Sequence, residues 1–176
     1  MDTKLEPIVK ALQEKFGSAV HEFRNEVHVF VKPEQIVEAL TLLRDTYSFE
    51  LMSAMNAVDY WPQASSPQGE TPRYHVFYQL TSLANNLSLQ VRVPVNGEDP
   101  RVPTVTQVYA NANWREREVW DMFGVVFEGH PNLTRILLPP DFVGHALRKD
   151  YPLGYEEPQF TFNFEDIDVR KPYAKE

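Results

Sequence analysis

One short stretch of this sequence, residues 114–124, concentrates side chains that could carry out acid–base chemistry or form ion pairs. Arg117 lies four residues before Asp121 and Arg115 three before Glu118, so pairs within a helix could neutralise these charges, at a few tenths of a kcal/mol each. However, consecutive charges spaced by about 100° per residue surround a helix, and the apolar neighbours also need burial. At least one charge must therefore meet a partner other than water, which predicts an arginine–carboxylate network or a docking surface.

Other polar residues are weaker candidates for chemistry. His130 and His145 are 15 residues apart with Asp141 between them, a spacing that matches no compact metal site. Asp59, Glu118 and His130 could supply acid–base chemistry, although no motif places the three together. A small stand-alone α+β hydrolase that uses these three residues is therefore the alternative function.

The sequence lacks the motifs of several catalytic and cofactor sites. It has no G-x-G-x-x-G or G-x-x-x-x-G-K-[ST] phosphate cradle and no G-x-S-x-G nucleophile elbow. It has no cysteine, which excludes disulfides, thiolate nucleophiles and cysteine-ligated iron–sulfur clusters in this chain. We therefore expect no redox cofactor to be bound by this chain itself.

The charge balance limits the classes of partner. With 25 acidic and 17 basic residues, the net charge of -8 repels phosphate backbones and anionic lipid, so neither nucleic acid nor a membrane surface is an expected partner. Residues 1–10 are too charged for a signal peptide, and no window approaches the roughly 20 apolar residues that span a bilayer. We expect a cytoplasmic-type protein without direct membrane insertion.

Apolar periodicity predicts three helices. The first is expected over residues 5–16, the second over residues 33–43, and the third from a cap at Asn111 or Asn113 to Phe123.

Alternating and β-branched runs predict five strands, which include two hairpins. The proline- and serine-rich residues 61–72 are expected to form an exposed loop. This order of elements predicts an α+β domain over residues 1–128, with a mostly antiparallel sheet and flanking helices in two layers. The strands are expected at residues 20–23, 27–31, 47–60, 74–80 and 87–95.

The composition and the periodicity of the sequence change at residue 129. Residues 129–176 contain six of the 14 prolines and seven aromatic residues, without a convincing helical or strand period. So many aromatic side chains are not typical of a solvated linker. The segment is predicted to be an extended C-terminal arm that buries its rings on another surface, and the alternative is that it folds back on its own domain.

The stretch from Glu116 to Leu137, EREVWDMFGVVFEGHPNLTRIL, closely resembles the signature of the C-subunit family of NADH-quinone oxidoreductase, a family of peripheral-arm subunits of respiratory complex I. LRKDYP at residues 147–152 and VDY at residues 58–60 are similar to two further blocks of that family. The resemblance covers essentially the whole chain. One departure is Thr134, where a basic residue is expected in many relatives.

This resemblance implies a protein that supports proton-translocating NADH:quinone oxidoreduction without its own redox centre. NADH, FMN, the iron–sulfur clusters and quinone would be bound by other subunits of the complex. The chain would pack against the quinone-site subunit, which is the D subunit, near the B and I subunits, at the cytoplasmic face of the bacterial inner membrane.

The same resemblance suggests roles for the charged residues. Four residues would fix the third helix and the junction after it: Glu116, Arg117, Glu118 and Asp121. Five more would anchor the arm on the quinone-site subunit: His130, Arg135, Arg148, Asp150 and Tyr151. A free-standing adaptor for some other assembly would share the arm and differ in its partners.

Overall fold

The computed structural model describes residues 2–24, 26–61, 72–97 and 99–152, and beyond these residues 162, 165, 166 and 169. Most of the predicted loop, at residues 62–71, lies outside the described residues, as do most residues of the segment 153–176.

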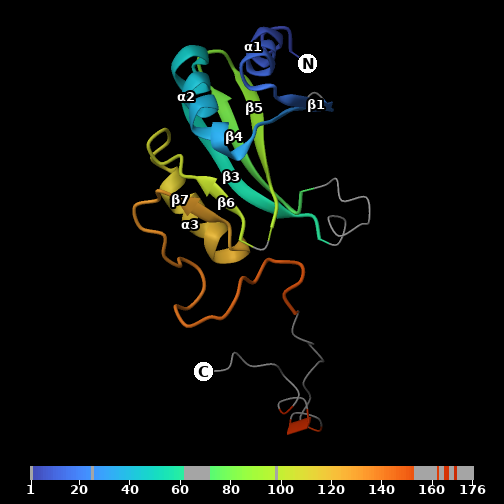
Figure 1. The fold of residues 1–176 in the computed structure, drawn as a ribbon, viewed down its shortest axis with the longest axis vertical. Coiled ribbons are helices and arrows are strands. Elements are labelled where there is room, and N and C mark those ends of the chain that lie inside the picture. Colours follow the sequence, from blue (N-terminus) through green and yellow to red (C-terminus); the bar gives the residue numbers. More distant parts are fainter. Residues whose placement is uncertain are drawn as a thin grey trace.

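Five strands form one sheet in the order β1-β2-β5-β4-β3 (Figure 1). Neighbouring strands are antiparallel except β2 and β5, which run parallel. The predicted α+β class with a mostly antiparallel sheet is confirmed. The strands span Ala19–Phe23 (β1), Glu26–Phe30 (β2), Leu51–Asp59 (β3), Tyr74–Ser82 (β4) and Leu87–Val95 (β5).

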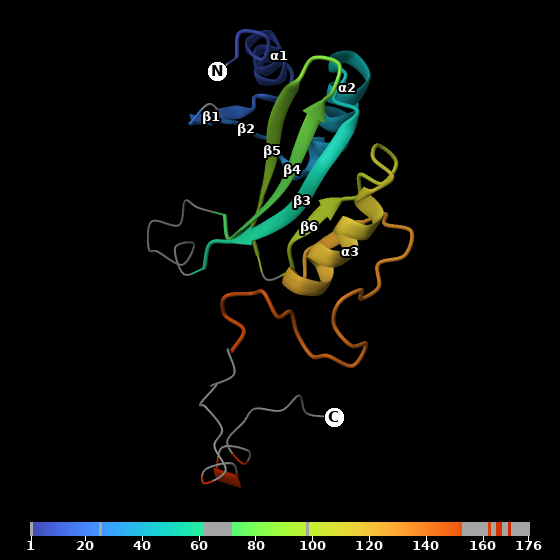
Figure 2. The ribbon, with the colours of Figure 1, turned by 180° about the vertical axis from the view of Figure 1, so that it is seen from behind.

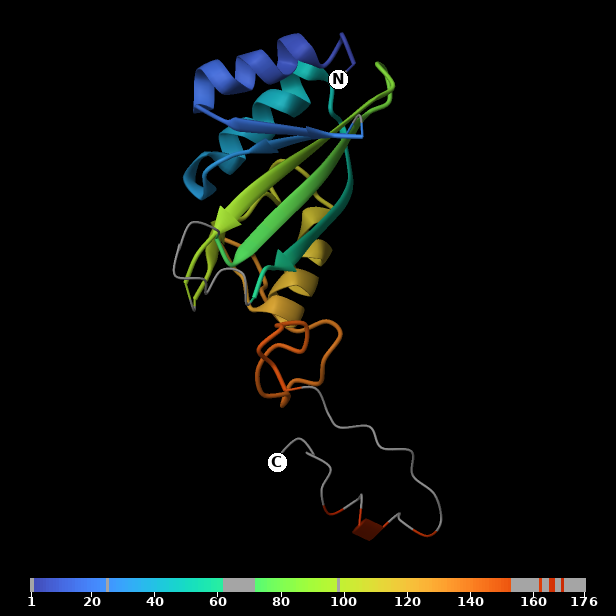
Figure 3. The same ribbon diagram turned by 90° about the vertical axis from the view of Figure 1, so that its right-hand side faces the viewer.

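Helices α1 (Glu6–Phe16) and α2 (Ile36–Tyr47) lie on one face of this sheet, and the 3-10 turn η1 (Pro33–Gln35) leads into α2 (Figure 3). The strands bury alternate residues on this face, because successive side chains of a strand point to opposite sides. The core side chains from β4 and β5 include Tyr74, Val76, Tyr78, Leu80, Leu89, Val91 and Val93.

Helix α3 (Ala112–Phe123) packs along β3, beside a short parallel pair formed by β6 (Arg101–Pro103) and β7 (Val126–Glu128) (Figure 2). The sequence predicts the helix but not the pair, because three residues are too few to show a strand period.

The predicted cap of α3 is wrong in its chemistry. The backbone of Asn111 is helical and its side chain caps no amide; instead its Nδ2 donates to the Met52 carbonyl, 2.8 Å away. The nearby Tyr109 hydroxyl donates to the Phe49 carbonyl at 2.6 Å. Both bonds connect a side chain just before α3 to a backbone carbonyl at or just before the start of β3. Neither bond caps a backbone amide of the first turn of α3.

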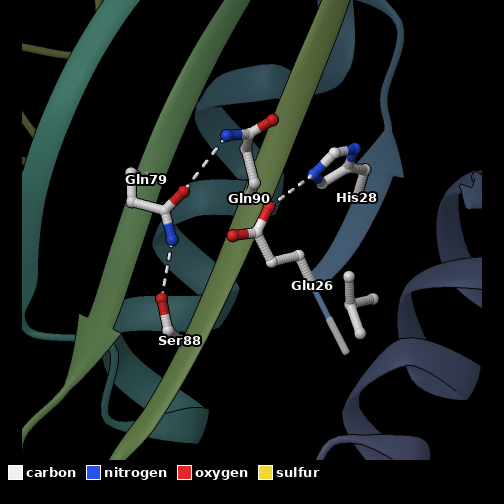
Figure 4. Close-up of a pocket in the computed structure, with 6 residues that line it drawn as sticks. Glu26, His28, Gln79, Ser88 and Gln90 are labelled. Carbon is white, nitrogen blue, oxygen red and sulfur yellow. Dashed lines mark hydrogen bonds and ion pairs between the residues drawn. The ribbon is translucent and has the colours of Figure 1, made fainter. Parts of the chain in front are cut away.

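The other face of the sheet is polar and carries a small pocket (Figure 4). The side chain of Gln79 donates through Nε2 to Ser88 Oγ at 2.6 Å, and its Oε1 accepts from Gln90 Nε2 at 3.1 Å. Glu26 Oε2 lies 3.8 Å from His28 Nε2. Among the described residues, no helix has the length and apolarity needed to cross a bilayer.

Candidate functional site

Helix α3 carries charged side chains on several sides, and these side chains contact different partners. Glu118 forms an exposed ion pair with Arg115 at 3.0 Å. Arg117 donates to the carbonyls of Thr134 and Arg135, at 3.0 and 3.1 Å, so it reaches the segment that follows β7. The side chains of Glu116 and Asp121 are completely buried. The two buried carboxyl groups therefore define the site.

The Asp121 carboxylate holds the start of the C-terminal segment. Its Oδ2 accepts from three successive amides, those of Ile136, Leu137 and Leu138, at 3.0, 2.8 and 2.9 Å. Its Oδ1 accepts from Arg135 at 2.5 Å. Burial alone would raise the pKa of Asp121, but these amides and the guanidinium favour the ionised form and lower the pKa to about 2.

Arg135 extends the same network. Its Nη2 donates to the carbonyls of Phe142 and Gly144, at 2.8 and 3.1 Å, and its guanidinium lies over the ring of Trp120, 5.6 Å from the centroid. A planar guanidinium can make these directed bonds together, whereas an ammonium group has no such fork. Residues 142–144 are thereby held beside the helix.

The same segment completes the C-terminal end of α3. The carbonyls of the last turn of a helix have no partner within the helix. Here the carbonyls of Asp121, Met122 and Phe123 are bonded by His145 Nδ1, Leu147 N and Arg148 Nε, at 3.0, 3.0 and 2.6 Å. Arg148 also suits the negative end of the helix dipole.

A second carboxylate ties the segment to the ends of β3 and β4. Arg73 donates through Nε and Nη2 to Asp59, at 3.1 and 3.0 Å, and through Nη2 to Asp150 at 2.6 Å. The Lys149 amide donates to Asp59 at 2.9 Å. Burial acts to raise the pKa of Asp59, but the bonds from Arg73 and from the Lys149 and Trp61 amides lower it below its usual value.

Glu116 makes a more local set of contacts. Its Oε1 accepts from the Val105 amide at 2.7 Å, and its Oε2 lies 2.5 Å from the Thr104 hydroxyl and 3.9 Å from His130 Nε2. Burial raises the pKa of Glu116 to about 7, against the opposing effect of the Thr104 and Val105 bonds.

The structure does not assemble the hydrolase alternative. Asp59 is bonded to Arg73, Glu118 to Arg115, and His130 to the Asn113 carbonyl. In the described part of the chain no hydrogen bond or ion pair joins any two of the three proposed catalytic residues. The described residues also contain no group of three or more histidines and carboxylates that could hold a metal ion.

The described half of the C-terminal segment, residues 129–152, lies against its own domain through the bonds above. Tyr151 packs its ring on Phe142, with centroids 5.7 Å apart. Arg73 and the amides of residues 136–138 are site groups that the sequence did not suggest. Arg73 stands alone after the 61–72 loop, and a backbone amide has no sequence signature.

We predict that Asp121→Asn lowers the free energy of unfolding by about 3 kcal/mol, because one oxygen and an amide group cannot replace the acceptors for three amides and Arg135. The carboxylate's contribution is fully present above its unfolded pKa of 3.8 and is lost as the pH falls through about 2. The difference in the free energy of unfolding between the parent protein and Asp121→Asn, measured with urea, should therefore become smaller below about pH 4. Glu118→Gln is the matched control and should cost under about 0.5 kcal/mol. Equal losses for both variants would contradict the role of Asp121.

We predict that Gly124→Ala is more destabilising than Gly17→Ala. Both glycines end a helix with positive φ, 76° and 64°, so both substitutions carry a backbone cost of about 1 kcal/mol. A Cβ on Gly17 meets nothing within 4 Å, whereas one on Gly124 would overlap Arg148 and lie 2.5 Å from His145. Urea unfolding should show at least about 2 kcal/mol for Gly124→Ala. Trypsin should also cleave more rapidly after Lys149 in this variant, and equal behaviour of the two variants would refute the close packing.

Comparison with known proteins identifies relatives over most of the chain. Residues 29–157 match the family described as respiratory-chain NADH dehydrogenase, 30 Kd subunit. The NADH-quinone oxidoreductase C subunit of Roseiflexus sp. (strain RS-1) is 44% identical over 177 residues, which cover 99% of this chain and 97% of that protein. The NADH-quinone oxidoreductase C/D subunit of Chromohalobacter salexigens is 40% identical over 153 residues, which cover 84% of this chain and 26% of that protein.

Two solved structures share the fold. A trypsin-resistant fragment (1-134) of Nqo5 superposes with a TM-score of 0.65 at 33% identity, and covers 74% of this chain and 100% of the fragment. A chain of the membrane-bound sulfane sulfur reductase, an archaeal respiratory membrane complex, gives a TM-score of 0.62 at 28% identity, with 77% of this chain and 76% of that chain covered. Together with the family match, these similarities show that the chain belongs to the family of the 30 kDa subunit of respiratory-chain NADH dehydrogenase, which in bacteria such as Roseiflexus is named the C subunit of NADH-quinone oxidoreductase.

Proposed function

We propose that this chain is a structural and assembly subunit of the peripheral arm, and that its own residues perform no catalysis. NADH, FMN, the iron–sulfur clusters and quinone would all be bound by other subunits. The absence of cysteine supports this division of roles, because cysteine thiolates are the usual ligands of such clusters. The charged residues also support it, since the partners of Asp59, Glu116 and Asp121 lie within the chain.

The observation that carries this proposal is the orientation of residues 136–147. Their backbone is fastened to α3 through Asp121 and Met122, yet Leu137, Val143 and Leu147 are 62%, 73% and 51% exposed. Capping a helix needs only the polar backbone groups of such a segment. Apolar side chains displayed on a fixed backbone are typical of a surface that another protein covers.

Helix α3 also carries an exposed apolar side chain, that of Trp114. Trp114 is 60% exposed and lies under the guanidinium of Arg117, 5.2 Å from the ring centroid, and Arg117 in turn bonds the carbonyls of residues 134 and 135. Tryptophan and arginine are enriched among the residues that dominate the energy of interfaces. We propose that Trp114, Leu137, Val143 and Leu147 together form one surface, which we call the outer apolar face.

We propose the quinone-site D subunit as the neighbour that covers the outer apolar face, with the B and I subunits nearby and the complex at the cytoplasmic face of the bacterial inner membrane. The Chromohalobacter relative supports this neighbour, because its name joins C with D and this chain corresponds to only 26% of its length. Two subunits joined in one polypeptide are expected to be close in the assembly. The residues beyond 152 would add contacts of their own.

We predict that Leu137→Asp lowers incorporation into the membrane-extracted complex at least tenfold, roughly, because an interface would lose one buried leucine and gain a desolvated charge. The measurement is the amount of this chain relative to its co-purified partners, determined by quantitative mass spectrometry. Urea unfolding of the isolated variant should remain near that of the parent protein, because Leu137 is exposed in the chain alone.

Leu83→Asp is the matched control. Leu83 is 67% exposed and follows β4, in the turn at the end of the sheet away from the C-terminal segment (Figure 2). The Leu83→Asp variant should be incorporated into the complex as the parent protein is. Normal incorporation of Leu137→Asp would remove the outer apolar face from the interface, and co-purification with non-respiratory proteins would favour an adaptor for another assembly.

A further inference from the structure

Two titratable side chains meet where the C-terminal segment leaves the domain. Glu116 projects from α3, and His130 follows β7 at the first turn of the segment. Neither side chain has any exposed surface, and His130 Nε2 lies 3.9 Å from Glu116 Oε2. Neither is needed for the outer apolar face, and a buried carboxyl group is costly when it is ionised.

The hydrogen bonds of His130 assign the donor and acceptor nitrogens of its ring. Nε2 is 3.2 Å from the Asn113 carbonyl, which can only accept, so Nε2 carries a hydrogen. The Asn132 amide donates to Nδ1 at 3.0 Å, so Nδ1 carries a lone pair. His130 is therefore held as the neutral Nε2–H tautomer.

Glu116 is consequently buried beside a neutral ring. Of the elements packed around it, β4 contributes Tyr78, a titratable but neutral phenol, and the loop that follows β6 contributes the hydroxyl of Thr104 at 2.5 Å. In the described ranges no lysine or arginine lies within ion-pair distance of the carboxyl group. Burial raises the pKa of Glu116 to about 7. Burial also raises the pKa of Tyr78, and the negative charge of ionised Glu116 raises it further.

We propose that Glu116 and His130 form a buried proton switch at the root of the C-terminal segment, residues 129–134. While Glu116 is protonated, the neutral pair packs tightly and Asn132 stays bonded to His130. When Glu116 ionises, the charge has no cation beside it, and opening of the root is the route by which water reaches the carboxylate. The proton thus controls how firmly α3 holds the start of the segment.

The sign of the effect follows from the direction of the shift. The pKa of Glu116 rises from 4.5 to about 7 on folding, so the stabilisation of the closed root is complete below pH 4.5 and is lost as the pH rises through about 7. If the carboxyl group regains its ordinary pKa in the open form, linkage predicts about tenfold more opening at pH 8 than at pH 6.

The test is the solvent exchange of the Asn132 amide in the full chain, measured by NMR between pH 6 and pH 8. Each rate is divided by that of the same amide in Glu116→Gln, which removes the intrinsic pH dependence of exchange. We expect this ratio to rise about tenfold in the parent protein and equally in Glu118→Gln, whose exposed carboxylate only pairs with Arg115. A flat ratio would overturn the proposal.

Thr104→Val keeps the proposal testable should Glu116→Gln fail to fold. The hydroxyl of Thr104 favours the ionised carboxylate, so its loss should move the step in exchange to higher pH. Here an exposed amide within the 129–152 segment that is not bonded to the domain serves as the reference for intrinsic exchange. A step that stays at the same pH, or no step in either protein, would show that Glu116 does not control the root.

Discussion

The carboxylate of Asp121 is the interaction on which the geometry of the C-terminal segment depends. One buried charge accepts three successive backbone amides and the guanidinium of Arg135, so the path of residues 135–138 is set by a single side chain. The carbonyls at the end of α3, which have no partner within the helix, bind residues 145, 147 and 148. Asp59 binds the amide of Lys149. A carboxylate has enough acceptor positions for all these donors, and it becomes strongly acidic as a result.

These ties explain how an irregular segment can present a defined surface. Residues 129–152, which follow β7, contain no helix or strand, yet their backbone amides are bonded to Asp121 and Met122 near the end of α3 and to Asp59 at the end of β3. The polar groups face inward and several apolar side chains face outward, which reverses the usual arrangement of a surface loop. Binding to such a surface would lose little conformational entropy, because the segment is already ordered. The proposed role as an assembly subunit therefore follows from the order of the segment more than from its composition.

Much of the fold could be predicted from the sequence, because the helices and the β4–β5 hairpin repeat apolar residues at helical and strand periods. The β6–β7 pair and the parallel contact of β2 with β5 could not, since one is too short and the other joins strands about 60 residues apart. In the candidate site, the crowded charges of α3 predicted an arginine–carboxylate network or a docking surface. This pattern could not identify the partners, because those of Asp121 are backbone amides, and Arg73 meets Asp150 across 77 positions of sequence.

The central claim is that the segment is held by its own domain before any partner binds, and hydrogen exchange of the isolated chain tests this most directly. The structure predicts that the amides of Ile136, Leu137 and Leu138 exchange at least about 100-fold more slowly than in an unfolded chain, because a buried carboxylate accepts all three. Exchange at the rate of an unstructured peptide would contradict the claim, and would mean that the segment becomes ordered only on a partner.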